Sequence, residues 1–206
     1  IFAAPHVAIA SHSYSHPFFW YKASAGEGSD SYNLRIPGYR FDVKREVDGS
    51  IAYIERRLAP RGKKVEVFLW TGDCIPTSEA LRAVAAAGIV DMNGGDTVAT
   101  RSNPSLTYVE GLGLQRAGGF QVFAPNQNEN VYTNNWLGPY YEFERVIETF
   151  QLTESPRRLK PINIYFHTYL ASKRAGLKSL EKIFDYALSQ ETNPVFISEY
   201  ARKVVD

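Results

Sequence analysis

Short apolar runs alternate with amphipathic segments along most of the chain. Mostly apolar runs bounded by polar or turn-forming residues predict buried strands at 6–11, 65–70, 88–92, 120–123 and 162–166. Apolar positions at helical spacing predict helices at 50–58, 78–87, 140–150, 177–188 and 198–205. Because helices follow most of these strands, the pattern predicts an α/β protein with a largely parallel sheet. The polar segments 23–30 and 126–136 are predicted to be loops.

The predicted strands end in residues that carry chemistry. The five endings are His12, Thr71-Gly72-Asp73, Asn93-Gly94-Gly95-Asp96, Pro125-Asn126-Gln127-Asn128-Glu129 and His167-Thr168-Tyr169. In parallel α/β sheets and barrels the carboxyl ends of the strands meet at one edge, where sites are assembled. Each of Asp96 and Asn126 alone is an ordinary turn residue, but the five endings together favour a site.

The motif His12-Ser13-Tyr14-Ser15-His16 places two imidazoles just after the first predicted strand. Zinc and its divalent neighbours accept imidazole nitrogen as a ligand, and histidines at this spacing can reach one ion from a turn. The motif therefore makes His12 and His16 candidate metal ligands. The alternative is a pair of polar surface histidines.

Composition limits what such a site can belong to. The 206 residues, 44% of them hydrophobic, suffice for one core, so a single domain is expected. A net charge of +1 favours a neutral polymer or small molecule over nucleic acid or an anionic membrane. The single cysteine, Cys74, excludes an internal disulfide, and no apolar stretch approaches the about 18 residues of a membrane span. The beginning Ile1-Phe2-Ala3-Ala4-Pro5 suggests a domain excised from a longer chain.

Metal-dependent hydrolysis also needs an acid for the leaving group and a base for the attacking water. His167 is the candidate acid, and Asp73 is the candidate carboxylate that fixes its tautomer. A buried histidine bonded to backbone and a helix N-cap are the structural alternatives for these two residues. No acidic residue precedes Glu27, so a third ligand must come from Asp96 or from an earlier strand outside this chain.

Loop aromatics suggest a carbohydrate substrate. Tyr132 and Trp136 lie in the predicted asparagine-rich loop, and aromatic faces are platforms for sugar rings. The asparagine side chains around them can both donate to and accept from hydroxyl groups. This loop is therefore the candidate region for substrate contact.

The histidine motif at a strand end, followed much later by a strand that closes on His167, resembles the NodB-type polysaccharide deacetylases. Within that family the chain is similar to the deacetylase domains that act on the Pel biofilm polysaccharide. The similar stretches span nearly the whole chain: 11–20, Ile36-Pro37-Gly38-Tyr39 with Phe41-Asp42, 69–74, 93–97, 121–136 and 160–173.

The resemblance implies a deformed or partial (β/α) barrel with a divalent metal, zinc being the expected ion. His12 and His16 would be its ligands, His167 the general acid and Asp73 the orienting partner of that acid. Asp96 and Asn126 would line the rim of the site.

Two features depart from the family pattern. The family's first motif is an aspartate pair that supplies the base and a metal ligand, and it would lie before Ile1. We therefore expect a barrel that lacks its first strand or strands and holds the metal weakly or not at all. Arg35, in Arg-Ile-Pro-Gly-Tyr, loosely matches the family's base-steering arginine, with Arg40 as a rival.

By resemblance, the expected function is removal of N-acetyl groups from hexosamines, N-acetylgalactosamine being the expected sugar, of the Pel exopolysaccharide in biofilm biosynthesis. The enzyme would work in the periplasm on the exopolysaccharide, with an export-machinery protein as a second partner. One alternative is a catalytically idle deacetylase-like module that binds glycan or a secretion partner. Another is a glycoside hydrolase, whose paired carboxylates could come from Asp73, Asp96 and Glu129.

Overall fold

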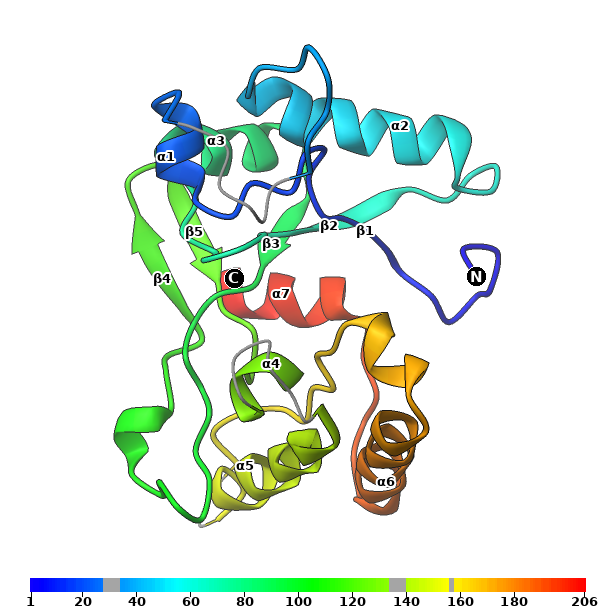
Figure 1. Ribbon diagram of the computed structural model, residues 1–206, viewed down its shortest axis with the longest axis vertical. Helices are drawn as coiled ribbons and strands as arrows, with labels where there is room; N and C mark the ends of the chain where they lie inside the picture. Colours follow the sequence, from blue (N-terminus) through cyan, green and yellow to red (C-terminus); the bar gives the residue numbers. More distant parts are fainter. Residues whose placement is uncertain (28–33, 134–139, 156–157) are drawn as a thin grey trace. The chain divides into compact units, whose positions relative to one another are not determined.

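The computed structural model describes residues 1–27, 34–133, 140–155 and 158–206 (Figure 1). The chain forms two compact units, each built from separate stretches of sequence. The first unit comprises Ile1–Gly94, Gly113–Phe123 and Val195–Asp206, and the second comprises Gly95–Leu112 and Ala124–Pro194. Each unit is described by itself below.

A three-stranded parallel sheet forms the centre of the first unit. Its strands are β1 (Ile9–Ser11), β2 (Val65–Leu69) and β3 (Val90–Met92), in the order β1-β2-β3 (Figure 1). Three of the predicted strands therefore form, each within its predicted range, and they pair in parallel as the alternating pattern indicated. The mixed α/β class is confirmed.

Neighbouring residues of β2 point to opposite faces of this sheet, and both faces are covered. Phe68 packs with residues of α3 (Ser78–Ala86), while Val67 packs with Ala201 of α7 (Ile197–Val205). Both β2 side chains are fully buried, which is typical of parallel strands covered on two sides. Helix α3 begins where the sequence indicated, because the hydroxyl of Thr77 accepts a hydrogen bond from the Ala80 N–H.

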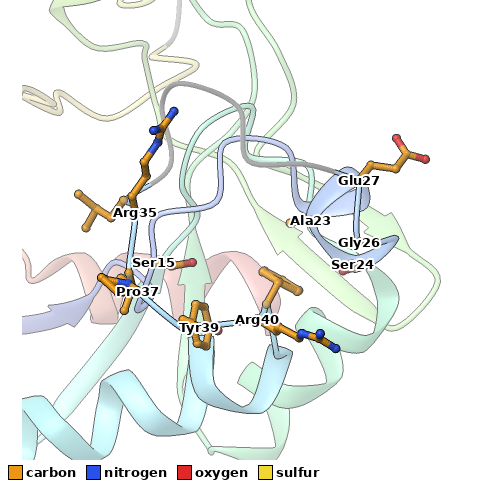
Figure 2. A pocket seen from close by; sticks show the side chains of 12 residues that line it. Ser15, Ala23, Ser24, Gly26, Glu27, Arg35, Pro37, Tyr39 and Arg40 are labelled. Atoms are coloured by element: carbon orange, nitrogen blue, oxygen red, sulfur yellow. The ribbon is translucent and has the colours of Figure 1, made fainter.

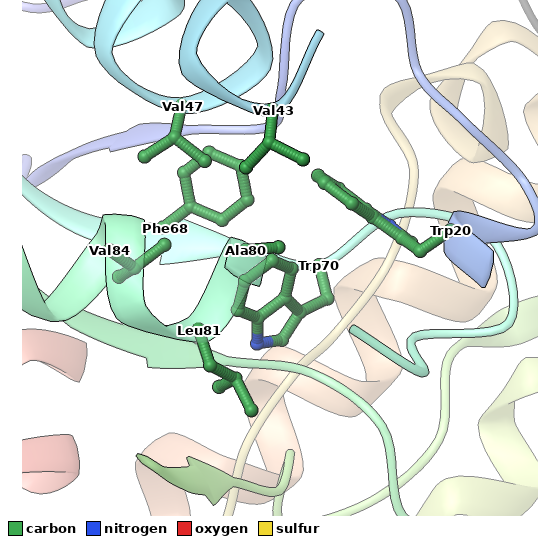
Figure 3. Packing of buried hydrophobic residues seen from close by; sticks show 8 residues of the cluster. All are labelled: Trp20, Val43, Val47, Phe68, Trp70, Ala80, Leu81 and Val84. Carbon is green, nitrogen blue, oxygen red and sulfur yellow. The ribbon is translucent and has the colours of Figure 1, made fainter. Parts of the chain in front are cut away.

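Aromatic side chains fill the core on the α3 face of the sheet (Figure 3). The indoles of Trp20 and Trp70 meet edge to face with centroids 5.1 Å apart, and both are fully buried. Trp20 begins α1 (Trp20–Ser24), inside the segment that follows the histidine motif. Val43 and Val47 close this core from the segment that leads through a π-helical turn, Arg45–Gly49, into α2 (Ser50–Arg57).

The predicted strand 120–123 pairs differently from expectation. β5 (Gly119–Val122) forms an antiparallel hairpin with β4 (Gly113–Arg116) and is not part of the parallel ladder. Gly118 and Gly119 adopt φ values of 125° and 157°, which a tight turn between these strands requires. The hairpin reaches β3 through a side chain, because the Val122 N–H donates to Oδ1 of Asp91 at 3.4 Å.

The second unit is helical in its regular elements. These are α4 (Glu129–Tyr132), α5 (Val146–Leu152), α6 (Arg174–Ser189) and the 3₁₀ helices Leu106–Tyr108, Tyr140–Arg145 and Thr168–Ser172. Its core gathers Tyr132, Phe143, Val146, Phe150, Leu170, Leu180 and Ile183. The predicted helix 140–150 starts as a 3₁₀ helix and becomes α-helical only at Val146.

The predicted strand 162–166 is wrong. Ile162, Ile164 and Phe166 are half-buried and pack against the core of the second unit. No β-ladder involves this segment among the residues that the structure describes. Apolar spacing indicates which side chains pack against a core, and a segment can pack in this way without pairing with another strand.

The described residues contain no closed barrel. They also contain no helix with the length and hydrophobicity needed to span a membrane.

Candidate functional site

The histidine motif forms a tight loop directly after β1. Ser13 and His16 adopt φ values of 64° and 54°, in the left-handed region that residues other than glycine rarely occupy. The His16 N–H donates to Oγ of Ser13 at 3.1 Å. Such backbone conformations cost free energy and persist where surrounding contacts enforce them.

A fully buried carboxylate holds this loop. Glu46 accepts hydrogen bonds from the backbone N–H groups of Tyr14 and Ser15, both at 2.8 Å, and from the Ser15 hydroxyl at 2.5 Å. The Tyr39 hydroxyl donates to the same carboxylate at 2.7 Å. Burial, and then the neighbouring Glu46, raise the pKa of the Tyr39 phenol, so it remains a donor.

Residues that follow β2 hold the chain directly after the histidine motif. The Thr71 hydroxyl donates to the carbonyl of Pro17 at 2.5 Å, and the Asp73 N–H donates to that of Phe18 at 2.9 Å. Gly72 lies between them with a φ of 61°, and a Cβ at this position would overlap the backbone of Phe18. Only glycine fits this approach, so the loop is fixed at both of its ends.

The two imidazoles of the motif lie side by side. Nδ1 of His12 lies 2.8 Å from the carbonyl oxygen of Leu69, which fixes the tautomer with the proton on Nδ1 and the lone pair on Nε2. The centroids of the His12 and His16 rings are 5.1 Å apart, at 74° to each other. Two imidazoles on one tetrahedral zinc, with Zn–N bonds of about 2.0–2.1 Å, have centroids roughly 5 Å apart.

This pair therefore fits two ligands of one ion. A zinc site needs at least one more protein ligand than these two. Among the described residues no group of three or more His, Cys, Asp or Glu side chains is arranged to hold a metal.

His167, in the second unit, is held by a different carboxylate. Nδ1 of His167 lies 2.8 Å from Oε1 of Glu129, and its backbone N–H donates to Oε2 at 3.1 Å. Glu129 is fully buried, whereas the His167 side chain is 29% exposed. The ring of Tyr169 stacks on the imidazole, with centroids 5.1 Å apart and planes 10° apart. The alternative of a buried histidine bonded to backbone is wrong, because the ring is partly exposed and bonds to the Glu129 carboxylate.

Asp73, the expected partner of His167, lies in the first unit. Its Oδ1 accepts a hydrogen bond from the Ile75 N–H at 3.0 Å. The alternative of a helix N-cap does not hold, since Thr77 caps α3. The carboxylate that contacts His167 within the second unit is Glu129.

Arg35 lies exposed on the wall of a cavity of about 710 Å³ in the first unit (Figure 2). Arg40, its rival, lines the same cavity, together with Ser15 of the histidine motif and Tyr39. The two arginine side chains extend in different directions from the wall (Figure 2). Because both line the cavity beside Ser15, Arg35 and Arg40 both stay candidates for contacts near the histidine loop.

The remaining candidates are divided between surface and interior. Asp96 is exposed and accepts a hydrogen bond from Gln127 at 3.1 Å. Asn126 is buried, and its Oδ1 has no hydrogen-bond partner among the described residues. Tyr132 was expected in a surface loop but lies in the core on α4, where its hydroxyl bonds to Thr149 at 2.6 Å. Trp136 lies outside the described residues.

Sequence reasoning missed the roles of Glu46 and Glu129. Both are charged residues that hydropathy assigns to the surface, yet both are fully buried. Glu129 was considered only as one acid of a glycoside hydrolase pair, and both of its oxygens are bonded to His167. The one signal in the sequence was Asn128, a good N-cap that starts α4 inside the predicted loop and places Glu129 in its first turn.

Comparison with known proteins identifies no relative: no family model, curated protein or solved structure matches the chain.

Proposed function

We propose that this chain is a divalent-metal-dependent polysaccharide deacetylase that removes N-acetyl groups from hexosamines. The observation that carries the proposal is the geometry of the histidine motif. The Leu69 carbonyl sets the tautomer of His12, and a left-handed backbone places the His16 ring 5.1 Å away. Surface histidines need neither constraint, whereas metal ligands are usually oriented in this way.

The proposed chemistry gives each candidate histidine a role, as the resemblance to polysaccharide deacetylases implies. A divalent ion held by His12 and His16 would polarise the acetamide carbonyl and lower the pKa of a water molecule. His167, as an imidazolium, would donate its Nε2 proton to the departing amine, while its Nδ1–H stays bonded to Glu129. The proposal leaves the base and a third ligand unassigned, because no group of three or more His, Cys, Asp or Glu side chains among the described residues could hold the ion.

The substrate part of the proposal rests on the resemblance to polysaccharide deacetylases. We assign N-acetylgalactosamine of the Pel exopolysaccharide as the substrate, the periplasm as the location and an export-machinery protein as a further partner. The finer architecture is proposed as a partial (β/α) barrel. Deacetylation would leave free amines on the polymer and so make it cationic.

The test is acetate release from N-acetylated glycan by the metal-loaded protein, with and without a chelator. His12→Ala and His167→Ala are each expected to lower the rate at least about 100-fold. His6→Ala, which removes an exposed histidine outside the motif, is the matched control and should leave the rate unchanged.

Bound zinc should also be counted by elemental analysis, because His12→Ala is expected to lower it and His167→Ala is not. Activity that survives the chelator and both substitutions would overturn the proposal. Glycan binding without acetate release by the unaltered protein would identify an idle binding module instead.

A further inference from the structure

We propose that Glu129 is the positioning residue of His167, with Tyr169 as the wall that fixes the plane of its ring. This inference deepens the proposed function and rests on it for the role of His167 as the acid. Glu129 and Tyr169 belong to the same unit as His167. Their contacts fix which ring nitrogen carries the proton and where the other nitrogen points.

The carboxylate of Glu129 cannot turn freely, because each oxygen has its own donor on His167. Oε2 accepts from the backbone N–H at 3.1 Å, and that donor cannot change its protonation. Oε1 is thereby directed at Nδ1 of the ring, at 2.8 Å. The carboxylate is fully buried, so water does not compete for these bonds. Nδ1 must therefore carry a proton, and Nε2 becomes the reactive nitrogen.

Aromatic and amide groups hold the plane of the ring. Tyr169 stacks nearly parallel to the imidazole of His167, and its hydroxyl accepts a hydrogen bond from Nδ2 of Asn130 at 2.9 Å. Asn130 directly follows Glu129 on α4, so one helix end places both groups. Tyr165 lies on the same segment, with its ring centroid 6.4 Å from that of His167.

This arrangement leaves Nε2 as the reactive nitrogen in both protonation states of the ring. In the imidazolium form, both ring nitrogens carry protons, and the buried carboxylate stabilises the charge through Nδ1–H while Nε2–H faces the leaving group. When the Nε2 proton moves to the departing amine, the ring is left neutral with its proton on Nδ1. That is the tautomer which Glu129 already selects.

Replacement by glutamine gives a sharp prediction because the backbone N–H of His167 decides how the amide turns. The carboxamide oxygen must face that N–H, since the alternative sets two donors against each other. The NH₂ group then faces Nδ1, which has to accept rather than donate. In Glu129→Gln the neutral ring should therefore carry its proton on Nε2, and the imidazolium should be disfavoured.

The first measurement is ¹⁵N NMR of the histidine ring nitrogens at a pH where the ring is neutral. His167 of the unaltered protein should show a protonated Nδ1, and Glu129→Gln should show the reversed tautomer. Glu181→Gln, an exposed glutamate of α6 in the same unit, is the matched control and should leave the signals unchanged. An unaltered protein with the proton on Nε2 would overturn the proposal without any variant.

The second measurement separates kcat from KM on the metal-loaded protein. Glu129→Gln should lower kcat by about 10²- to 10⁴-fold with little change in KM. Glu129→Asp keeps the negative charge and should recover part of kcat. Tyr169→Phe keeps the stacked ring and should lower kcat less than Tyr169→Leu, which removes it.

Several outcomes would contradict the positioning role. A Glu129→Gln variant that keeps both the wild-type tautomer and kcat would overturn it. If Glu129→Gln fails to fold, the tautomer of the unaltered protein still tests the role of Glu129, and the difference in kcat between Tyr169→Phe and Tyr169→Leu still tests that of Tyr169. An unaltered protein with the predicted tautomer but no deacetylase activity would sink the proposed function and leave the assignment of Glu129 standing.

Discussion

Each unit buries one glutamate completely beside a candidate histidine, and the two glutamates do different things. Glu46 accepts from two backbone N–H groups and two hydroxyls, so it fixes the path of the histidine loop and touches neither imidazole through these bonds. Glu129 accepts from the ring of His167 itself as well as from its backbone. The first carboxylate holds backbone geometry and the second controls a proton.

The difference shows what a buried carboxylate contributes in each setting. The donors around Glu46 cannot lose their protons near neutral pH, so removing Glu46 changes structure more than chemistry. The donor on Nδ1 of His167 can change its protonation, so removing Glu129 changes chemistry more than structure. Substitutions at the two positions should therefore separate stability from catalysis.

The largest expected effect on stability is at Glu46. Glu46→Ala leaves four donors without their acceptor and should lower the free energy of unfolding by about 3–5 kcal/mol. Glu129→Ala leaves fewer donors beside a partly exposed ring and should cost about 1–3 kcal/mol. Urea unfolding checks both values.

Asp48→Ala is the control for Glu46, because Asp48 is exposed on the same π-helical turn and should change stability by less than about 0.5 kcal/mol. If Glu129→Ala lowers the free energy of unfolding more than Glu46→Ala does, the assignment of a structural role to Glu46 and a chemical role to Glu129 is wrong.

Asp91 extends the comparison to a carboxylate with fewer partners. It accepts from the Trp70 indole at 2.5 Å and from the Val122 N–H at 3.4 Å, and burial raises its pKa from 3.8 to about 6. Between these values the folded state binds more protons than the unfolded state. Stability from this group is therefore complete below about pH 4 and is lost as the pH rises through about 6.

The measurement is the free energy of unfolding of the unaltered protein and of Asp91→Asn across this pH range. The unaltered protein should lose about 2–3 kcal/mol relative to the variant between pH 4 and pH 7. If the free energies of unfolding of the two proteins change in parallel with pH, the pKa of Asp91 does not differ between the folded and unfolded states.

Local pattern predicted the elements whose hydrogen bonds or burial are local. The helical spacing of apolar residues was enough to place α3, and β2 was predicted to within one residue. The segments 120–123 and 162–166 were misassigned because strand pairing depends on distant partners. Their apolar residues pack against a core, but their spacing did not reveal which strand, if any, they pair with.

Some residues of the candidate site could be predicted from the sequence and others could not. His12 and His16 could be proposed as ligands because their spacing and their position after a strand are visible in the sequence. Glu46 and Glu129 could not be found, because a buried carboxylate is recognised only by the donors that the fold brings to it. Tyr132 was misplaced because four residues of α4 turn a predicted loop into part of a core.

Lys160 gives the smallest expected effect and one of opposite sign to that of Asp91. Its side chain is buried in the second unit, Nζ donates to the Gly111 carbonyl at 2.7 Å, and burial lowers its pKa from 10.5 to about 8 although Glu110 opposes the change. Between these values the unfolded chain binds the extra proton, so stability should rise with pH, by about 1 kcal/mol between pH 8 and 9. Lys160→Met preserves the length of the side chain without the amine and should show no such rise when unfolding by urea is followed at both values. Asp91 makes the first unit less stable as the pH rises, whereas Lys160 makes the second unit more stable. If the free energy of unfolding of Lys160→Met still rises between pH 8 and 9, Lys160 is not the cause, and this contrast between the units is wrong.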